Sequence, residues 1–348
     1  MVAKNASDLF FRAGGIPRLR VDGLVIPMSD VALSVDDVMA ASEELMTSKQ
    51  REIFKANMDV DFAYYFEGLD RRFRVSIFMQ RNWPSIVIRN IPNVIQSFDD
   101  LQLPSEVLKK LSMEKRGLIL LTGTMGSGKS TTIASMIEYI NNNCNKHILT
   151  VEEPIEYTFK DKKSLINQRE LGLDVSSYRA ALKAFTLQSP DVIFIGNIRD
   201  HDTMDAAITA AETGVLVLST LHTVNASQSV ERIVNFFPPH QHQEIKNQLA
   251  SILKGVISLR LIPTKNAGGR LPAYEAMLLT PTISRLIREG KVSEMQQYIE
   301  DGEVFGMCSF NQSLLKLVRQ GKISEEEAVG FADNRDEFML ALKGIRRA

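Results

Sequence analysis

The chain has few of the features typical of secreted, membrane-spanning or metal-stabilised proteins. Its 348 residues include only two cysteines, which lie far apart and follow no C-x-x-C spacing. We therefore expect neither a disulfide framework nor a zinc ribbon. The short apolar run near the N-terminus is interrupted by Asp8 and Arg12, so no signal peptide or membrane span is expected there. Any membrane association must then come through a partner.

An excess of charge of one sign is also missing. Lysine and arginine number 41 and aspartate and glutamate 42, for a net charge of -1. No overall field attracts nucleic acid or an anionic bilayer, so we expect no nucleic-acid partner. The sequence does contain 44% apolar residues, over a length sufficient for two ordinary domains. These features predict a cytoplasmic globular protein.

The first hundred residues are predicted to form a mixed α and β domain. Alternation of apolar and polar residues indicates strands within 17–25 and 72–79, and a helical pattern runs from Val35 to Lys55 with Ser34 as its N-cap. The sequence turns polar around 99–104, before a short helix expected over 106–111. We place the domain boundary there, which gives domains 1–101 and 102–348.

Between residues 117 and 222, apolar strands alternate with helices, which predicts a parallel sheet covered by helices in an α/β fold. The expected strands are 118–121, 148–151, 192–195 and 215–218. Asp202 is the expected N-cap of a helix through 204–212, and Gly214 lies just past its end. From about 240 the chain is expected to be mainly helical, with a tight turn between two strands at 267–270 and C-terminal helices over about 275–348.

A phosphate-binding motif follows the first of these strands. The sequence GTMGSGKS matches G-x-x-x-x-G-K-S/T and lies between a strand and a helix over 131–140, as this motif requires. Its backbone N–H groups and the helix N-terminus favour phosphate, its lysine can bridge the β and γ phosphates, and its last serine can ligate magnesium. We therefore predict ATP and Mg²⁺ as cofactors, with Ser130 as the metal ligand. The predicted binding residues are Gly123, Thr124, Met125, Gly126, Ser127, Gly128, Lys129, Ser130 and Thr131.

Polar residues follow the other strands of the predicted sheet. Glu152, Glu153 and Glu156 come after strand 148–151, Asn197 after strand 192–195, and His222 after the last strand. Ligands bind at the carboxyl ends of strands in open sheets, so an acid here could orient water or magnesium and the histidine could contact the γ phosphate. The alternatives are a solvated acidic loop and a hydrogen-bonded structural histidine.

Collinear motifs make the whole chain resemble the type IV pilus retraction ATPases, the PilT and PilU group of secretion ATPases. They are ASDLFFRAGGIPRLRVDG near the start, FRVSIFMQRN, the phosphate loop, HILTVEEPIEY, NQRELG, IFIGNIRD, AAETGVLVLSTLHT and TISRLIREGK. FRVSIFMQRN, NFFP and the tail FADNRDEFMLALK favour the PilU branch. The last motif, TISRLIREGK, resembles part of a segment specific to retraction.

The resemblance implies a PAS-like N-terminal domain, a RecA-like domain with a helical C-terminal extension, and a homo-hexamer with nucleotide between neighbouring subunits. It also implies arginine contacts to the phosphates, for which Arg74, Arg81 and Arg89 are the candidates and Arg81 the preferred one. The implied function is pilus retraction in twitching motility, and the implied partners are an inner-membrane platform protein and a second retraction ATPase. The implied location is cytoplasmic and peripheral at the inner membrane.

The sequence departs from this family at its catalytic positions. Asn197 stands where the family has glutamate, Val215 replaces the first histidine of the AAETGVLVLSTLHT motif, and Glu153 replaces an aspartate. An amide cannot act as a general base, although it can orient water. Two hypotheses stay open: a weakly hydrolysing accessory subunit of another motor, and an ordinary ATPase in which a nearby glutamate positions the water. A nucleic-acid translocase is disfavoured because residues 240–260 contain few cations.

Overall fold

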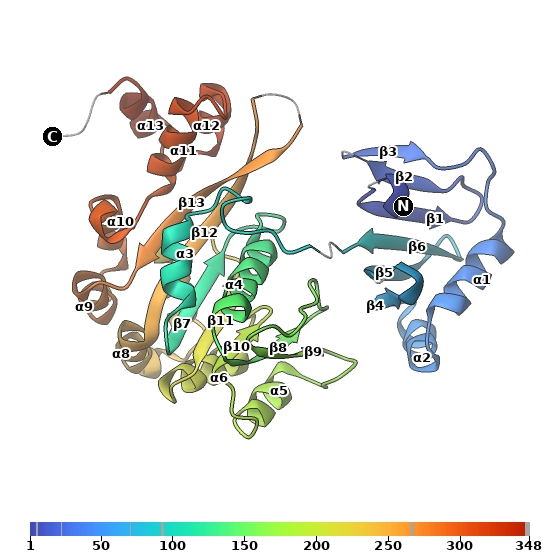
Figure 1. Ribbon diagram of the computed structural model, residues 1–348, viewed down its shortest axis with the longest axis horizontal. Coiled ribbons are helices and arrows are strands. Elements are labelled where there is room, and N and C mark those ends of the chain that lie inside the picture. Colours follow the sequence, from blue (N-terminus) through green and yellow to red (C-terminus); the bar gives the residue numbers. More distant parts are fainter. Residues whose placement is uncertain (5, 22, 70, 92–93, 266–267, 345–348) are drawn as a thin grey trace. The chain divides into compact units, whose positions relative to one another are not determined.

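The computed structural model describes residues 1–348 except 5, 22, 70, 92–93, 266–267 and 345–348. The chain divides into two units, 1–94 with 154–158 and 95–153 with 159–348. Each unit combines a sheet with helices (Figure 1), as the predicted α/β class requires. The boundary predicted between residues 101 and 102 concerns independently folding domains and stays a prediction. Within the described residues, no helix combines the length and apolarity needed to cross a membrane.

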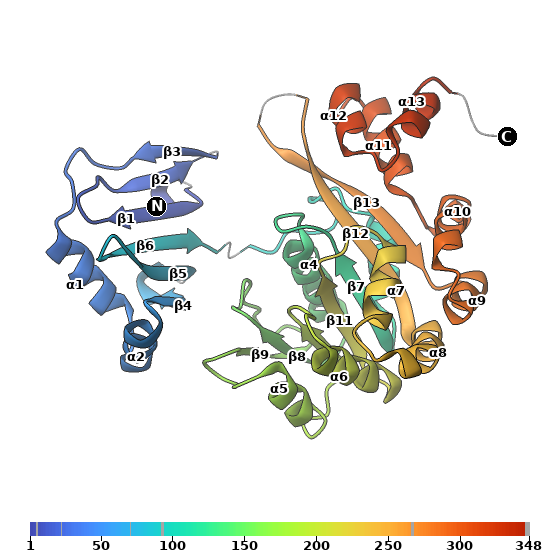
Figure 2. The same cartoon turned by 180° about the vertical axis from the view of Figure 1, so that it is seen from behind.

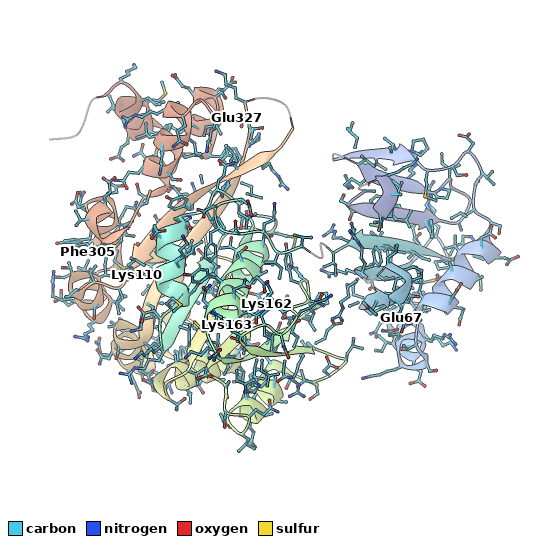
Figure 3. All side chains as sticks on the ribbon, viewed as in Figure 1. Glu67, Lys110, Lys162, Lys163, Phe305 and Glu327 are labelled. Atoms are coloured by element: carbon cyan, nitrogen blue, oxygen red, sulfur yellow. The ribbon has the colours of Figure 1, made fainter. Side chains whose placement is uncertain are left out.

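The first unit is built on a six-stranded antiparallel sheet of order β3-β2-β1-β6-β5-β4. Its strands are β1 (Asp8–Arg12), β2 (Arg18–Val21), β3 (Leu24–Pro27), β4 (Asp59–Phe66), β5 (Arg71–Gln80) and β6 (Trp83–Asn90), its helices are α1 (Val35–Leu45) and α2 (Ser48–Asn57), and two 3-10 turns span Val2–Lys4 and Glu67–Leu69. Figure 3 labels Glu67 in the second of these turns. Val75 and Ile77 of β5 are buried in the core shared with α1, and Arg74 and Ser76, which alternate with them along the strand, lie on the other face.

The single helix predicted from Val35 to Lys55 is wrong. Ser34 is the N-cap of α1, as predicted, and forms a capping box with Asp37. The chain leaves the helix at Met46, and Thr47 then caps α2 in a second capping box with Gln50. A threonine followed three residues later by glutamine is a helix-start signal inside the apolar periodicity. That signal divides the segment into two helices.

The second unit is built on a seven-stranded sheet of order β13-β12-β7-β11-β10-β8-β9. The elements up to its last strand are α3 (Ser105–Ser112), β7 (Gly117–Thr122), α4 (Lys129–Asn143), β8 (His147–Glu152), β9 (Leu165–Glu170), α5 (Tyr178–Phe185), β10 (Val192–Ile195), α6 (His201–Glu212), β11 (Leu216–Leu221), α7 (Ala226–Val234), α8 (His242–Ile252), β12 (Leu253–Pro263) and β13 (Arg270–Leu278). The four predicted strands are present and parallel, with β13 the antiparallel edge. Helices α3 and α4 cover one face and α7 the other (Figures 1 and 2).

Two long strands and a set of short helices form the C-terminal part. Strands β12 and β13 occupy much of the region expected to be mainly helical, and the predicted turn at 267–270 falls partly outside the described residues. The helices that follow are α9 (Pro281–Glu289), α10 (Met295–Glu300), α11 (Phe310–Arg319), α12 (Glu325–Phe331) and α13 (Arg335–Leu342), with 3-10 turns at Val292–Glu294 and Glu303–Phe305; a further 3-10 turn, Pro239–Gln241, precedes α8. Phe310 and Phe338 anchor a small separate core, so α11, α12 and α13 pack as a distinct layer on the strand pair, whereas α9 and α10 belong to the main core of the unit.

The predicted cap of α6 is wrong by two residues. The helix begins at His201, and the Asp200 carboxylate accepts a hydrogen bond of 2.8 Å from the backbone N–H of Thr203. Asp202 instead lies in the first turn, where it forms an ion pair of 3.0 Å with Arg179. Gly214 follows the helix with a φ of 105°, in the left-handed region that favours glycine.

Candidate functional site

The predicted phosphate loop connects the end of β7 to the start of α4. Gly123 has a φ of 140°, and a Cβ at this position would lie 2.5 Å from Ser127 Oγ and 2.6 Å from the Leu259 carbonyl oxygen. No other residue fits there. Gly128 is the N-cap of α4 with a φ of 98°, so the helix N-terminus faces the loop without a side-chain cap. The nine predicted residues thus form one continuous loop and first helical turn.

Lys129 is held across this loop. Its side chain is only 7% exposed, and Nζ donates hydrogen bonds of 2.8 Å to the carbonyl oxygens of Gly123 and Thr124. Ser127 Oγ is buried and has no hydrogen-bond partner among the described residues. Ser130 and Thr131 are half-buried in the first turn, whereas Met125 is exposed at the loop tip. A confined cation, an unused buried hydroxyl and an open helix N-terminus fit a phosphate chain in both charge and donor chemistry.

Three other predicted residues, His222, Asn197 and Glu153, lie along the same edge of the sheet. Strands β7, β11, β10 and β8 are parallel neighbours in that order, so the residues that follow them align from the phosphate loop to His222, Asn197 and Glu153. Carboxyl ends of parallel strands meet at one edge, and this is where open α/β sheets bind ligands. The sheet therefore brings together side chains that are up to about a hundred residues apart in sequence.

Asn197 and His222 contact each other at this edge. The Asn197 amide nitrogen lies 3.2 Å from His222 Nε2, so the amide can donate to an unprotonated ring nitrogen. Burial, and then the positive charges of Lys129 and Arg199, hold the pKa of His222 below its usual value. The ring is thus neutral at physiological pH. Asn197 is buried, and its Oδ1 has no hydrogen-bond partner among the described residues.

The three predicted glutamates occupy different environments. Glu152 is buried and accepts hydrogen bonds from Thr150 Oγ1 at 2.7 Å and Gln168 Nε2 at 3.1 Å, which ties it to the sheet. Glu153 is exposed and forms an ion pair of 3.2 Å with Arg199. Glu156 is exposed and belongs to the 154–158 segment grouped with the first unit. Of the three, Glu153 has the accessible carboxylate beside the Asn197 strand end.

Sequence reasoning missed a tyrosine at this edge. Tyr178 is the first residue of α5, and its buried hydroxyl has no hydrogen-bond partner among the described residues. Burial, and then the nearby charge of Glu153, raises the pKa of Tyr178 to about 12. The hydroxyl lies 3.5 Å from the point that a Cβ at Gly196 would occupy, so it lies beside the end of β10. The signal available in sequence was the capped helix start at Ser177.

Two of the predicted arginines lie opposite each other in the first unit. Arg74 of β5 pairs in register with Arg89 of β6, which in turn pairs with Asp8 of β1. Arg89 donates a hydrogen bond of 2.9 Å to the buried Asp8 carboxylate, and Arg20 lies 3.2 Å from its other oxygen. Arg74 forms a longer ion pair, 3.7 Å, with Asp61. These arginines are therefore already engaged in cross-strand contacts.

Arg81 lies elsewhere on the same hairpin. It forms, with Asn82, the two-residue turn between β5 and β6, where both residues have positive φ, 51° and 66°. Such a turn matches the twist of the strands it joins. Because Arg81 lies seven residues along the strand from Arg74, the two are separated by roughly 20 Å. The preferred candidate and the other pair cannot reach one phosphate group from a single subunit.

The chain is similar in sequence and structure to several known proteins. A family model described as type II/IV secretion system protein matches residues 1–330. The chain is 41% identical to the type IV pilus ATPase PilU of Pseudomonas aeruginosa over 99% of this chain and 89% of PilU. It is 42% identical to the pilus retraction ATPase PilT of the same organism over 93% of this chain and 94% of PilT. A crystal structure of the pilus retraction motor PilT with bound ADP matches with a TM-score of 0.90 at 41% identity, over 97% and 96% of the two chains.

Proposed function

The chain belongs to the type II/IV secretion system protein family, in its PilT and PilU group, and from this premise we propose that it is an ATP-driven motor of type IV pilus retraction. The observation that carries the proposal is the phosphate loop with Lys129 confined across it, at the edge where His222 and Asn197 meet. The relatives' names speak of pilus ATPases, and this chain has the residues for the same chemistry. We assign it to the PilU branch on the basis of its sequence motifs.

Each site residue has a proposed role in hydrolysis. Residues 123–131 bind the phosphates of ATP through backbone N–H groups, and Lys129 turns from the loop carbonyls toward the β and γ phosphates. Ser130 is positioned in the first helical turn to hold Mg²⁺, which would compensate phosphate charge. His222, neutral and beside Lys129, contacts the γ phosphate. Asn197 orients the attacking water with its unused Oδ1.

The proposed assembly is a homo-hexamer, in which arginines of one subunit's first unit complete the nucleotide site of a neighbour. Arg81 is the proposed contact because its turn leaves the guanidinium exposed, whereas Arg89 is engaged by Asp8. Arginine suits this role through its planar set of donors. The proposed location is the cytoplasm, at the inner membrane, through the pilus platform protein and beside a second retraction ATPase.

Single-turnover hydrolysis tests the enzymatic part of this proposal. The wild type should hydrolyse ATP, and Lys129→Ala should abolish hydrolysis because the phosphates lose their buried cation. Asn197→Glu should raise the rate by about a hundredfold, since a carboxylate beside the neutral His222 can take the proton that an amide cannot. A wild-type rate equal to that of Asn197→Glu would show that the amide does not limit turnover. Absence of hydrolysis in both would contradict the ATPase itself.

Gene deletion tests the cellular part. Deletion, with and without a second retraction ATPase, should leave surface pili in excess and reduce twitching, because pili are extended but not withdrawn. Lys129→Ala should fail to complement. A weakly hydrolysing accessory subunit would give the same result in cells, because Lys129→Ala would again fail to complement the deletion. It would differ from a motor in one respect: the hydrolysis rate of the purified wild-type protein would stay near background. Unchanged piliation and twitching in both backgrounds would overturn the assignment to retraction.

A further inference from the structure

A carboxyl group that no predicted motif includes is fully buried in the second unit. Glu275 lies in the middle of β13, and its side chain is 0% exposed. Its Oε1 accepts a hydrogen bond of 2.8 Å from the backbone N–H of Ala226. Its Oε2 is buried and makes no hydrogen bond of normal length among the described residues, although the Gln296 side chain lies near the carboxyl group. A buried carboxyl is costly, so its position calls for an explanation.

The hydrogen bond from Ala226 completes the N-terminus of α7. Asn225 is the N-cap of this helix, and its side chain accepts from the N–H of Gln228, the third helical residue. The N–H of Ala226, the first helical residue, has no partner within the helix. Glu275 supplies that partner from a strand two positions away from the phosphate-loop strand in the sheet. The start of α7 is thereby attached to β13.

The segment between His222 and α7 is attached to the helix in turn. Val224 donates its N–H to Gln228 Oε1 at 3.0 Å, and the hydroxyls of Thr223 and Ser229 lie 2.6 Å apart. Only three residues separate His222 from the first residue of α7. The short segment after His222 is therefore held between the end of β11 and the start of α7.

Glu275 is also in register with both halves of the nucleotide site. It pairs with Ser258 of β12, Ser258 pairs with Thr122 of β7, and Thr122 pairs with Leu221 of β11. Thr122 donates a hydrogen bond of 2.8 Å to Ser258 across this row. Thr122 directly precedes the phosphate loop, and Leu221 directly precedes His222. Glu275 is thus aligned across the sheet with the residue before the phosphate loop and with the residue before His222.

We propose that Glu275 is a positioning residue for nucleotide discrimination: by fixing the start of α7 it places His222 beside the phosphate loop, so that the site distinguishes ATP from ADP. This inference rests on the proposed function, in which His222 contacts the γ phosphate. ADP lacks that phosphate, so its binding depends on the loop and Lys129 alone. Glu275 therefore acts on ATP binding and leaves ADP binding unchanged.

The surroundings of Glu275 agree with such a role. Burial raises the pKa of Glu275 to about 7, with a further increase from Asp333, while the Ala226 hydrogen bond, Arg260 and Gln296 lower it. Arg260 and Asp333 are themselves an ion pair. The Oε1 acceptor that Ala226 uses is present in the neutral carboxyl, the carboxylate and an amide alike. The positioning contact is therefore retained when Glu275 is replaced by glutamine.

Equilibrium binding of ADP and of a non-hydrolysable ATP analogue, both with Mg²⁺, tests the inference on the full chain. The wild type should prefer the ATP analogue, and His222→Ala should reduce this preference about tenfold, the usual effect of losing one hydrogen bond to a charged group. Glu275→Leu should reduce it about fivefold to tenfold, and the double variant no further than His222→Ala. Glu275→Gln should stay within about twofold of the wild type. ADP affinity should change less than about threefold throughout.

A matched control comes from the neighbouring residue of β13. The N–H of Tyr274 donates a hydrogen bond of 3.1 Å to Ser313 Oγ of α11, which is another contact between β13 and a helix, away from α7. Ser313→Ala should leave the preference for the ATP analogue unchanged. If Glu275→Leu does not fold, Glu275→Asp replaces it, because the aspartate side chain is one methylene shorter and its carboxylate does not reach the Ala226 N–H.

The outcomes separate the inference from its premise. A normal preference in Glu275→Leu or Glu275→Asp, together with a lost preference in His222→Ala, overturns the role of Glu275 and leaves the proposed function intact. A normal preference in His222→Ala overturns both the γ-phosphate contact and the inference built on it. Additive losses in the double variant would mean that Glu275 acts independently of His222, which also contradicts the proposal.

Discussion

Two buried carboxyl groups, one in each unit, differ in pKa because different groups surround them. Asp8 lies on the face of the first sheet away from the core shared with α1, between Arg20 and Arg89 on the adjacent strands. Burial would raise the pKa of Asp8, but the hydrogen bonds from Arg89 and Ser7 and the charges of both arginines outweigh it and lower the pKa. Glu275 lies under α7 with one backbone donor, and burial dominates. The arginines on adjacent strands favour the charged form of Asp8, whereas burial under α7 favours the protonated form of Glu275.

The sharpest test of this difference is the pH dependence of stability. Because the folded-state pKa of Glu275 is about 7 and the ordinary value is 4.5, the folded chain holds this proton more tightly. Its contribution is complete below pH 4.5 and is lost as pH rises toward 7, by on the order of 3 kcal/mol. Glu275→Gln should remove this decline, as measured by urea unfolding between pH 5 and 8. Parallel curves for the two proteins would contradict the assigned environment.

Asp8→Asn should have a smaller effect of the opposite sign. The lowered pKa of Asp8 means that its contribution is present above the unfolded value of 3.8 and is lost as pH falls through the folded value. The substitution should cost about 1–2 kcal/mol at pH 7, since partly exposed arginines contribute less than buried ones. Hydrogen exchange of β1 and β6 measures this, and the difference should vanish in acid. An equal loss at pH 7 and pH 3 would exclude the ion pairs as its cause.

Arg81→Gly should have the smallest effect on stability. The left-handed conformation of Arg81 costs about 1 kcal/mol, which glycine avoids in part, so the hairpin should become about 0.5 kcal/mol more stable. Asn82→Gly is the matched control and should gain less, because asparagine tolerates this conformation. Hydrogen exchange of β5 and β6 measures both. If Arg81 contacts phosphate in a neighbouring subunit, only Arg81→Gly should also lose ATPase activity; two equally active variants would remove Arg81 from the site.

The parts that sequence predicts best are those in which local pattern and burial agree. Strand β10 matches its predicted bounds, and β7 extends its prediction by one residue at each end, because each is a fully buried apolar run bounded by turns. The phosphate loop follows from its glycines, whose conformation no other residue adopts easily. The family is also confirmed, since the motifs are spread along the whole chain.

The parts that sequence misses depend on contacts between distant residues. The sequence around Glu275 does not indicate that Ala226 donates a hydrogen bond to it. An acid within the apolar run LPAYEAML does indicate an unusual buried carboxyl group. The Tyr178 hydroxyl meets the Glu153 strand end only through the order of the sheet. The separation of Arg81 from Arg74 depends on which residues form the turn. Thr47 and Gln50 do indicate a helix start, but the apolar periodicity continues through them and predicts a single helix.

The turn that carries Arg81 is followed directly by Trp83, the only tryptophan of the chain, which is 47% exposed. Indole emission shifts to shorter wavelength when water around the ring is replaced by protein. With excitation that selects tryptophan over tyrosine, the native fluorescence of the unmodified protein therefore reports on the neighbourhood of Arg81. If a neighbouring subunit closes over the turn as proposed, rapid mixing with ATP should change this intrinsic fluorescence and time that closure without an attached dye.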